Sequence, residues 1–122
     1  MERVEEFSLD GKIVVYIDFS GLSADKDFLE VIKAAEPVIA RHPEDSVYTI
    51  TNIANLRFDS HTKDIAAVYM EHNKPYVKHG VIIGLDGIKK MMARTVMKLS
   101  GRSNMEFAFT KEQAIEWLQK QG

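Results

Sequence analysis

The sequence predicts an α/β fold in which a mostly parallel sheet of about five strands packs against four helices, in the order ββαβαβαβα. Short runs rich in β-branched and aromatic residues alternate along the chain with longer segments whose apolar residues recur at helical spacing. Strands that alternate with helices are joined by crossover connections, which place neighbouring strands parallel. The pair Asp10-Gly11 between the first two extended runs predicts a hairpin, so the N-terminal strand should add an antiparallel edge.

The length, composition and net charge of the chain are those of an ordinary globular protein. The chain has 122 residues without a repeat or linker, so one domain over residues 1–122 is expected. The net charge of −2 argues against nucleic-acid binding, and the absence of cysteine excludes thiolate catalysis and Cys-based metal sites. No apolar run approaches the roughly 18 residues of a membrane span, and the acidic N-terminus is unlike a signal peptide. A cytoplasmic protein is therefore expected.

The first half of the chain is predicted to hold a hairpin and a long helix. Residues 3–9 and 12–19 should form the two strands, and the second is nearly continuous in apolarity, as a buried strand is. A helix over residues 24–41 should follow. Pro37 lies inside it and should kink or split it near residues 33–36, because proline removes a backbone hydrogen bond. The predicted inner face consists of Phe28, Val31, Ile32, Ala35, Val38 and Ile39.

The middle of the chain is predicted to hold a strand, a helix and a second strand. Residues 47–51 are good strand formers, and the most buried-looking run, Val81-Ile82-Ile83, lies in a strand over residues 76–85. The helix between them should span residues 60–73, with Pro75 just beyond its end. Its predicted inner face consists of Ile65, Val68, Tyr69 and His72.

The last third of the chain is predicted to hold a helix, a short strand and a final helix. The first of these helices, over residues 88–100, has a predicted inner face of Ile88, Met91, Met92, Val96 and Leu99. In the strand, Met105, Phe107 and Phe109 alternate with other residues. Thr110 and Gln113 have the spacing of a capping box at the start of the final helix. That helix should turn Ala114, Ile115, Trp117 and Leu118 inward.

Short polar residues gather where the central strand leads into the second predicted helix. The first turn of that helix is Asp59-Ser60-His61-Thr62, with Arg57 just before it. One interpretation is an N-cap, in which a side-chain oxygen accepts a backbone N–H. The other is an anion or phosphorylation site, because the same turn offers unpaired N–H groups and Arg57 could pair with an anion.

A basic stripe on the third predicted helix is the second candidate surface. Lys90, Arg94 and Lys98 are spaced four residues apart and so share one face. This face is either simply solvated or a docking surface for an acidic partner or a lipid headgroup. The four histidines have no metal-ligand spacing, and no nucleophile–base pair can be assembled from local spacing. Neither a metal, nor a cofactor, nor an enzymatic activity is expected.

Three segments carry a resemblance to a known family: Asp18-Phe19-Ser20-Gly21-Leu22, Phe58-Asp59-Ser60 and Gly84-Leu85-Asp86-Gly87. With the order of elements, they resemble the STAS superfamily, named for sulfate transporters and anti-sigma-factor antagonists. The nearest likeness is to its SpoIIAA-like branch, which is also likened to a class of lipid-binding domains. In the antagonists this helix begins Asp-Ser-Ser-Gly, and a partner kinase phosphorylates the second Ser. Asp59 and Ser60 match the first two positions, while His61 and Thr62 stand at the acceptor and Gly positions.

Two functions follow as expectations. The resemblance implies a non-enzymatic regulatory or protein-interaction module of bacterial signalling, with an unidentified protein partner. The alternative is a domain that binds a small apolar ligand or a lipid, for which the methionines of the third helix and the apolar strand ends are suitable. A homodimer is left open.

Overall fold

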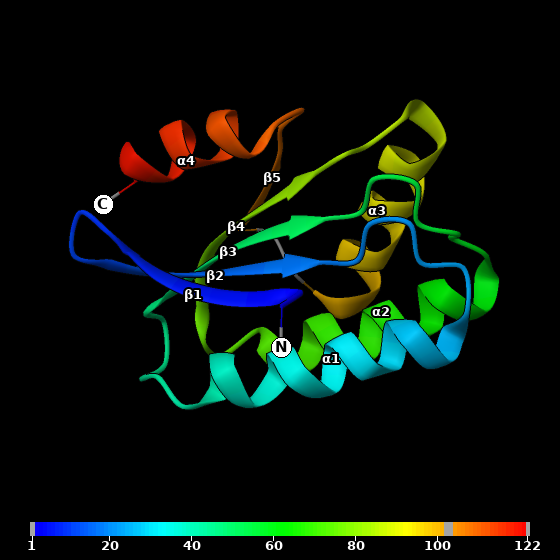
Figure 1. Cartoon of the computed structure of the whole chain (residues 1–122), viewed down its shortest axis with the longest axis horizontal. Helices are drawn as coiled ribbons and strands as arrows, with labels where there is room; N and C mark the ends of the chain where they lie inside the picture. Colours follow the sequence, from blue (N-terminus) through cyan, green and yellow to red (C-terminus); the bar gives the residue numbers. More distant parts are fainter. Residues whose placement is uncertain (1, 102–103, 122) are drawn as a thin grey trace.

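The structure is a computed structural model that describes residues 2–101 and 104–121, all but residues 88, 89 and 92 with their side chains. Five strands form one sheet in the order β1-β2-β3-β4-β5, flanked by four helices (Figure 1). The elements along the chain are β1 (Val4–Leu9), β2 (Lys12–Asp18), α1 (Asp25–Ala40), β3 (Val47–Asn52), α2 (Ser60–Asn73), β4 (Val77–Ile83), α3 (Gly87–Ser100), β5 (Met105–Phe107) and α4 (Lys111–Gln119).

The sheet is mixed, which corrects the prediction of a mostly parallel sheet. β1 runs antiparallel to β2, whereas β2, β3, β4 and β5 are parallel to their neighbours. The hairpin that causes this is confirmed: Leu9 pairs with Lys12, and Asp10 and Gly11 have φ angles of 51° and 81°. Two residues cannot span the length of a strand, so the strands that they join must be antiparallel.

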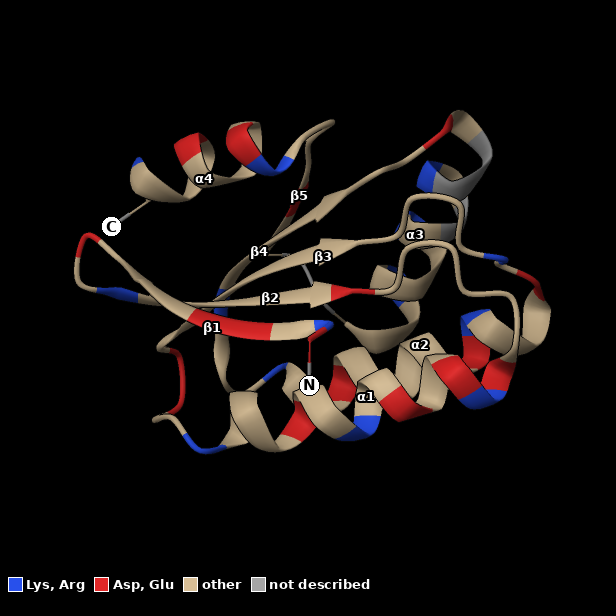
Figure 2. Ribbon diagram, in the orientation of Figure 1, with Lys and Arg blue, Asp and Glu red and all other residues tan. Residues whose placement is uncertain are grey.

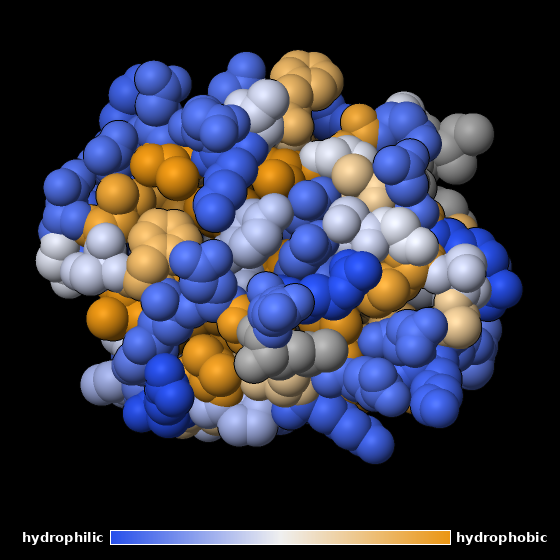
Figure 3. Space-filling view, viewed as in Figure 1, coloured by the Kyte–Doolittle hydropathy of each residue, from blue (hydrophilic) through white to orange (hydrophobic). Residues whose placement is uncertain are grey.

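Helices cover the two faces of the sheet unequally. α1, α2 and α3 lie on one face, and α4 lies on the other (Figure 1). Neighbouring residues of β2 accordingly point into different cores: Val15 packs with the three helices and Val14 packs with α4. Burial on both faces explains the nearly continuous apolarity of β2. On the face of the molecule seen in Figure 3, the outer apolar side chains form separate patches among polar ones.

α1 is one continuous helix, so of the two outcomes predicted near residues 33–36, a kink or a split, the split is wrong. Pro37 lies in the last turn and has no N–H to donate to the Lys33 carbonyl. Both residues are exposed, so water can satisfy that carbonyl. The predicted inner face is confirmed at five positions, and the sixth, Val38, is partly buried.

α2 has the predicted bounds but turns a different face to the core. Val68 is 70% exposed and His72 is also exposed, which corrects two of the four predicted inner positions. The buried residues are instead Thr62, Ala66, Tyr69 and Asn73. Polar Thr62 tolerates burial because its backbone N–H and its hydroxyl both donate to Asp59.

α3 likewise buries small residues in place of two predicted apolar ones. Met91 is 65% exposed and Leu99 is 60% exposed, while Ala93, Val96 and Ser100 are buried. Small side chains let α3 approach α2 and the sheet closely. Val96 is thus confirmed as an inner residue, and the side chains of Ile88 and Met92 lie outside the described part of the chain.

The C-terminal elements follow their predicted boundaries closely. β5 ends at Phe107, so Phe109 lies beyond the strand, 82% exposed. The predicted capping box of α4 is confirmed, because Thr110 and Gln113 bond reciprocally. Ala114 and Leu118 are buried, while Ile115 and Trp117 are partly buried. Within the described residues, no helix combines the length and apolarity that crossing a bilayer requires.

Candidate functional site

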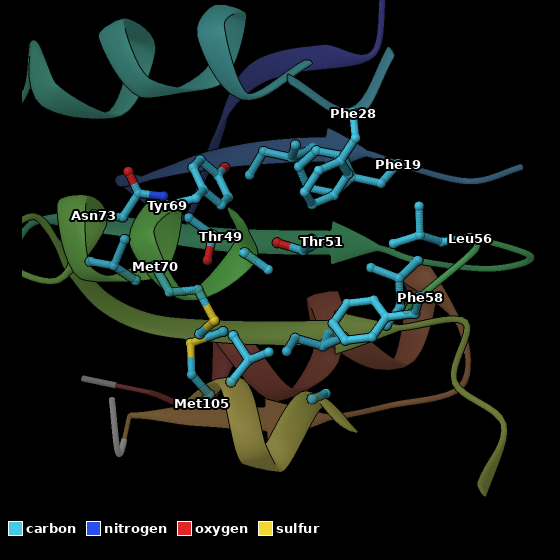
Figure 4. A pocket seen from close by; sticks show the side chains of 17 residues that line it. Phe19, Phe28, Thr49, Thr51, Leu56, Phe58, Tyr69, Met70, Asn73 and Met105 are labelled. Carbon is cyan, nitrogen blue, oxygen red and sulfur yellow. The ribbon is translucent and has the colours of Figure 1, made fainter. Parts of the chain in front are cut away.

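An apolar pocket lies between the sheet and the helices α2 and α3 (Figure 4). Its volume is about 60 Å³. Strand residues such as Ile17 and Ile82 form the floor, Ala66 of α2 and Ala93 of α3 line the helical wall, and Phe58 comes from the segment between β3 and α2. The complete lining is Ile17, Phe19, Phe28, Thr49, Thr51, Ile53, Leu56, Phe58, Ala66, Tyr69, Met70, Asn73, Val77, Ile82, Ala93, Val96 and Met105.

The chemistry of this lining is almost entirely apolar. None of the lining residues carries a charge, and the polar side chains are limited to Thr49, Thr51, Tyr69 and Asn73. Thr49 and Thr51 project from β3 toward the pocket (Figure 4). An apolar cavity with a few polar groups is the usual character of a site for a small neutral molecule.

Two methionines close one side of the pocket. The side chains of Met70 from α2 and Met105 from β5 approach one another there (Figure 4). Both are only partly buried, as is Phe58, whereas most other lining residues are fully buried. Methionine has flexible rotamers, so these two side chains can change the shape of the pocket without moving the backbone.

A glycine in β4 makes room for one of these methionines. A Cβ atom at Gly80 would lie 2.6 Å from the Sδ atom of Met105 and 2.7 Å from the Oγ1 atom of Thr49. Real Cβ atoms do not come so close to other heavy atoms. The absence of a side chain at Gly80 therefore lets Met105 and Thr49 occupy their places in the lining.

The volume limits what the pocket can hold as it stands. It exceeds the ~10–15 Å³ that one water molecule needs, but is smaller than the ~150 Å³ cavity known to bind benzene in another protein. Only a very small molecule fits without rearrangement. A ligand of benzene size requires Met70 and Met105 to move outward.

The predicted polar cluster at the start of α2 is formed around Asp59. Asp59 is the N-cap residue, and its Oδ1 atom accepts hydrogen bonds from the backbone N–H of Thr62 at 3.0 Å and from its hydroxyl at 3.1 Å. The pKa of Asp59 is lowered below its usual value, mainly by the hydrogen bond from the Thr62 backbone and next by the one from the Thr62 hydroxyl. The positive charge of Arg57 lowers it further. The N-cap interpretation is thus confirmed for Asp59.

The other predicted residues differ in accessibility. Thr62 is only 2% exposed, while Ser60 and His61 are exposed. Of the hydroxyls in this turn, Ser60 is therefore the one open to a modifying enzyme. Anion binding here stays a prediction, although an added anion would have to compete with the Asp59 carboxylate for the same N–H groups.

Asp25 is the member of this cluster that the sequence did not reveal. Its Oδ2 atom lies 2.6 Å from Nδ1 of His61, and its Oδ1 atom lies 3.6 Å from Nη2 of Arg57. Arg57 also pairs with Asp59 at 3.2 Å. Asp25 stands in the first turn of α1, where an acid is common, so nothing local marked it as a partner of α2. The cluster joins the starts of α1 and α2.

The basic stripe lies on α3, and no described hydrogen bond or ion pair joins it to the Asp59 cluster. Lys90, Arg94 and Lys98 are exposed. The Nζ atom of Lys90 and the Cζ atom of Arg94 each lie 5.6 Å from the centre of the Phe107 ring. The stripe is thus a surface feature supported by an aromatic ring of β5.

Comparison with known proteins adds no assignment. No protein-family model matches the sequence, and no curated protein matches it. In the part of the chain that the structure describes, no three His, Asp or Glu side chains gather as metal ligands would. The evidence on function therefore comes from three features of the structure: the pocket, the Asp59 cluster and the basic stripe.

Proposed function

We propose that this protein binds a small, neutral, apolar molecule in the pocket beneath α2 and α3. The observation that carries the proposal is the apolar pocket itself. Protein interiors are normally packed as densely as organic crystals, with few voids larger than a water molecule. A space of about 60 Å³ whose lining contains no charged side chain departs from that norm in the way that a ligand site does.

The side chains that line the pocket indicate which chemical class of ligand it can hold. Because no lining residue carries a positive charge, a carboxylate or phosphate inside the pocket would be buried without a counter-ion, which is costly. The hydroxyls of Thr49 and Thr51 can orient one polar group of a neutral ligand. We therefore expect an aromatic or short aliphatic molecule with at most one or two hydrogen-bonding groups.

The test is thermal unfolding in the presence of benzene or 1-hexanol, with native mass spectrometry of freshly purified protein. A ligand that binds only the folded state raises Tm as its concentration rises. Ala66→Leu fills the pocket and should abolish this shift. Ala67→Leu is the matched control, because Ala67 is the next residue of α2 and does not line the pocket.

The outcomes separate the proposal from its alternatives. A Tm shift that survives Ala67→Leu but not Ala66→Leu supports the pocket as the site. No shift with either probe, together with an apo mass in native spectra from several expression hosts, contradicts the proposal. Equal shifts in both variants also contradict it, because the probe would then bind elsewhere.

A second proposal is the regulatory interaction module that the resemblance to the STAS superfamily implies. The exposed Ser60 in the first turn of α2 supports it, because this side chain is open to a kinase while Thr62 is buried. Phosphopeptide mass spectrometry of the protein from its native cell tests it. If phosphate is never found at Ser60 or His61, the phosphorylation switch is ruled out.

A further inference from the structure

The outer surface of α3 and the segment just after β5 form a patch that combines positive charge with protruding apolar side chains. We define the α3 face as Lys90, Met91, Arg94, Lys98 and Phe109. All five residues are exposed, and Met91 and Phe109 are among the large apolar side chains that the protein leaves in water. The pocket lies on the opposite side of α3, lined by Ala93 and Val96, so the α3 face is independent of the proposed function.

The α3 face is continuous. One shallow hollow is lined by Lys90, Met91, Arg94 and Lys98, and a second is lined by Lys90 and Phe109 together with Phe107. Lys90 belongs to both hollows and connects them. Met91 thus shares one hollow with all three cations, and Phe109 shares the other with Lys90.

The positive charge of the α3 face is not neutralised within the described part of the chain. α3 contains no Asp or Glu, and none of the described ion pairs involves Lys90, Arg94 or Lys98. Acidic residues lie along β1, α1 and α4 (Figure 2). One acid, Asp86, lines the second hollow just before α3 begins. The α3 face is therefore a locally positive surface on a chain with a net charge of −2.

We propose that the α3 face docks onto an anionic lipid surface. Exposed cations are attracted to negatively charged headgroups, and neighbouring apolar side chains can enter the boundary between headgroups and acyl chains. Phe107 supports this geometry, because its ring lies beneath Lys90 and Arg94 and the ring packs toward the core.

The shape of the face favours a lipid surface over an acidic protein. Specific protein partners are held by well-packed, desolvated pockets at the centre of an interface. Here Met91 and Phe109 protrude singly and are 65% and 82% exposed. A fluid bilayer accepts such side chains without a matching shape.

The test is co-sedimentation of the whole protein with vesicles. Vesicles of phosphatidylcholine alone should not retain it, and vesicles with equal amounts of phosphatidylcholine and phosphatidylglycerol should. Added salt should weaken the binding, because exposed charges are screened. The triple variant Lys90→Gln, Arg94→Gln, Lys98→Gln should lower the partition coefficient about a hundredfold. Phe109→Ser should lower it about tenfold without changing the charge.

The matched control is Lys26→Gln, Lys33→Gln, Lys120→Gln, which changes the net charge equally at exposed positions of α1 and just after α4. It should bind the anionic vesicles nearly as the unchanged protein does, and circular dichroism should show that all variants fold. Three results would overturn the proposal. The first is that anionic vesicles do not retain the protein, and the second is that the control variant loses as much vesicle binding as the triple variant. The third is binding to poly-L-glutamate that is as strong as vesicle binding and is unchanged by Phe109→Ser. The last result would indicate an acidic protein partner.

Discussion

At the scale of single residues, Asp59 shows how one carboxylate can determine a helix start. Its side chain takes one of the N–H groups that a bound anion would otherwise use. It also faces Arg57, which in turn faces Asp25. Charged side chains of the protein itself therefore already pair at this turn. Asp59 acts as the N-cap without any bound ligand.

Acid titration is the first prediction. The folded-state pKa of Asp59 is lowered, so its contribution to stability is present above its unfolded pKa and is lost as the pH falls through the folded value. Asp59→Asn keeps a capping oxygen but cannot titrate. Between about pH 5 and pH 2, the free energy of unfolding of the variant should therefore fall less steeply than that of the unchanged protein.

Urea unfolding at a series of pH values measures this difference. Asp64→Asn is the control, since it removes the same charge from an exposed position of the same helix. Slopes that are equal in the unchanged protein and in Asp59→Asn would show that the N-cap carboxylate is not linked to folding.

At the scale of elements, the ends of the helices follow local chemistry, but their inner faces do not. α2 begins at its Asp59 cap and stops just before Pro75, and α4 begins at Thr110. In contrast, α2 and α3 turn Ala66 and Ala93 to the core and leave the larger Val68 and Met91 in water. Close packing of α3 against its neighbours favours small side chains. The spacing of apolar residues within one helix does not reveal that requirement.

The second prediction concerns the capping box of α4. Thr110→Ala removes the hydroxyl that accepts the N–H of Gln113 at 3.1 Å, so the free energy of unfolding should fall by about 1 kcal/mol. Thr95→Ala removes an exposed hydroxyl that donates to the Met91 carbonyl inside α3, and should change stability by less than about 0.5 kcal/mol. Urea unfolding of both variants checks the contrast, and an equal loss in both would argue against a special role for the cap.

At the scale of the whole molecule, the sheet divides the interior into two cores. The larger core lies under α1, α2 and α3 and contains the pocket, while the smaller lies under α4 alone. Val14 and Val15 of β2 belong to different cores, so one strand couples the two sides. We expect both cores to unfold together, as small domains generally do.

The third prediction tests this coupling from the α4 side. Leu118 is fully buried, so Leu118→Ala should lower the free energy of unfolding by about 2–5 kcal/mol, whereas Leu29→Ala at a 39% exposed position should cost about 1 kcal/mol or less. Trp117, the only tryptophan, reports on α4 through its fluorescence, and far-ultraviolet circular dichroism reports on all elements. The two urea transitions should coincide. An earlier fluorescence transition would mean that α4 unfolds independently.

Features built from neighbouring residues were predictable from the sequence. The Asp10-Gly11 hairpin, the bounds of α2 and the Thr110–Gln113 capping box all depend on residues at most a few positions apart. The Asp25–His61 contact was not predictable, because it joins residues 36 positions apart and neither residue type is unusual at its place. The pocket was not predictable either, since it needs side chains from the sheet, three helices and a loop.

The sequence by itself determined the helices, the strands and the turns between them, because backbone hydrogen bonds, caps and positive φ angles are local interactions. Only the tertiary structure decided which side of α2 and α3 is buried, that Asp25 pairs with His61, and that the core beneath these helices is incompletely filled. Those properties depend on how well side chains from distant segments fit together. Volume and shape in three dimensions, rather than residue type along the chain, set that fit.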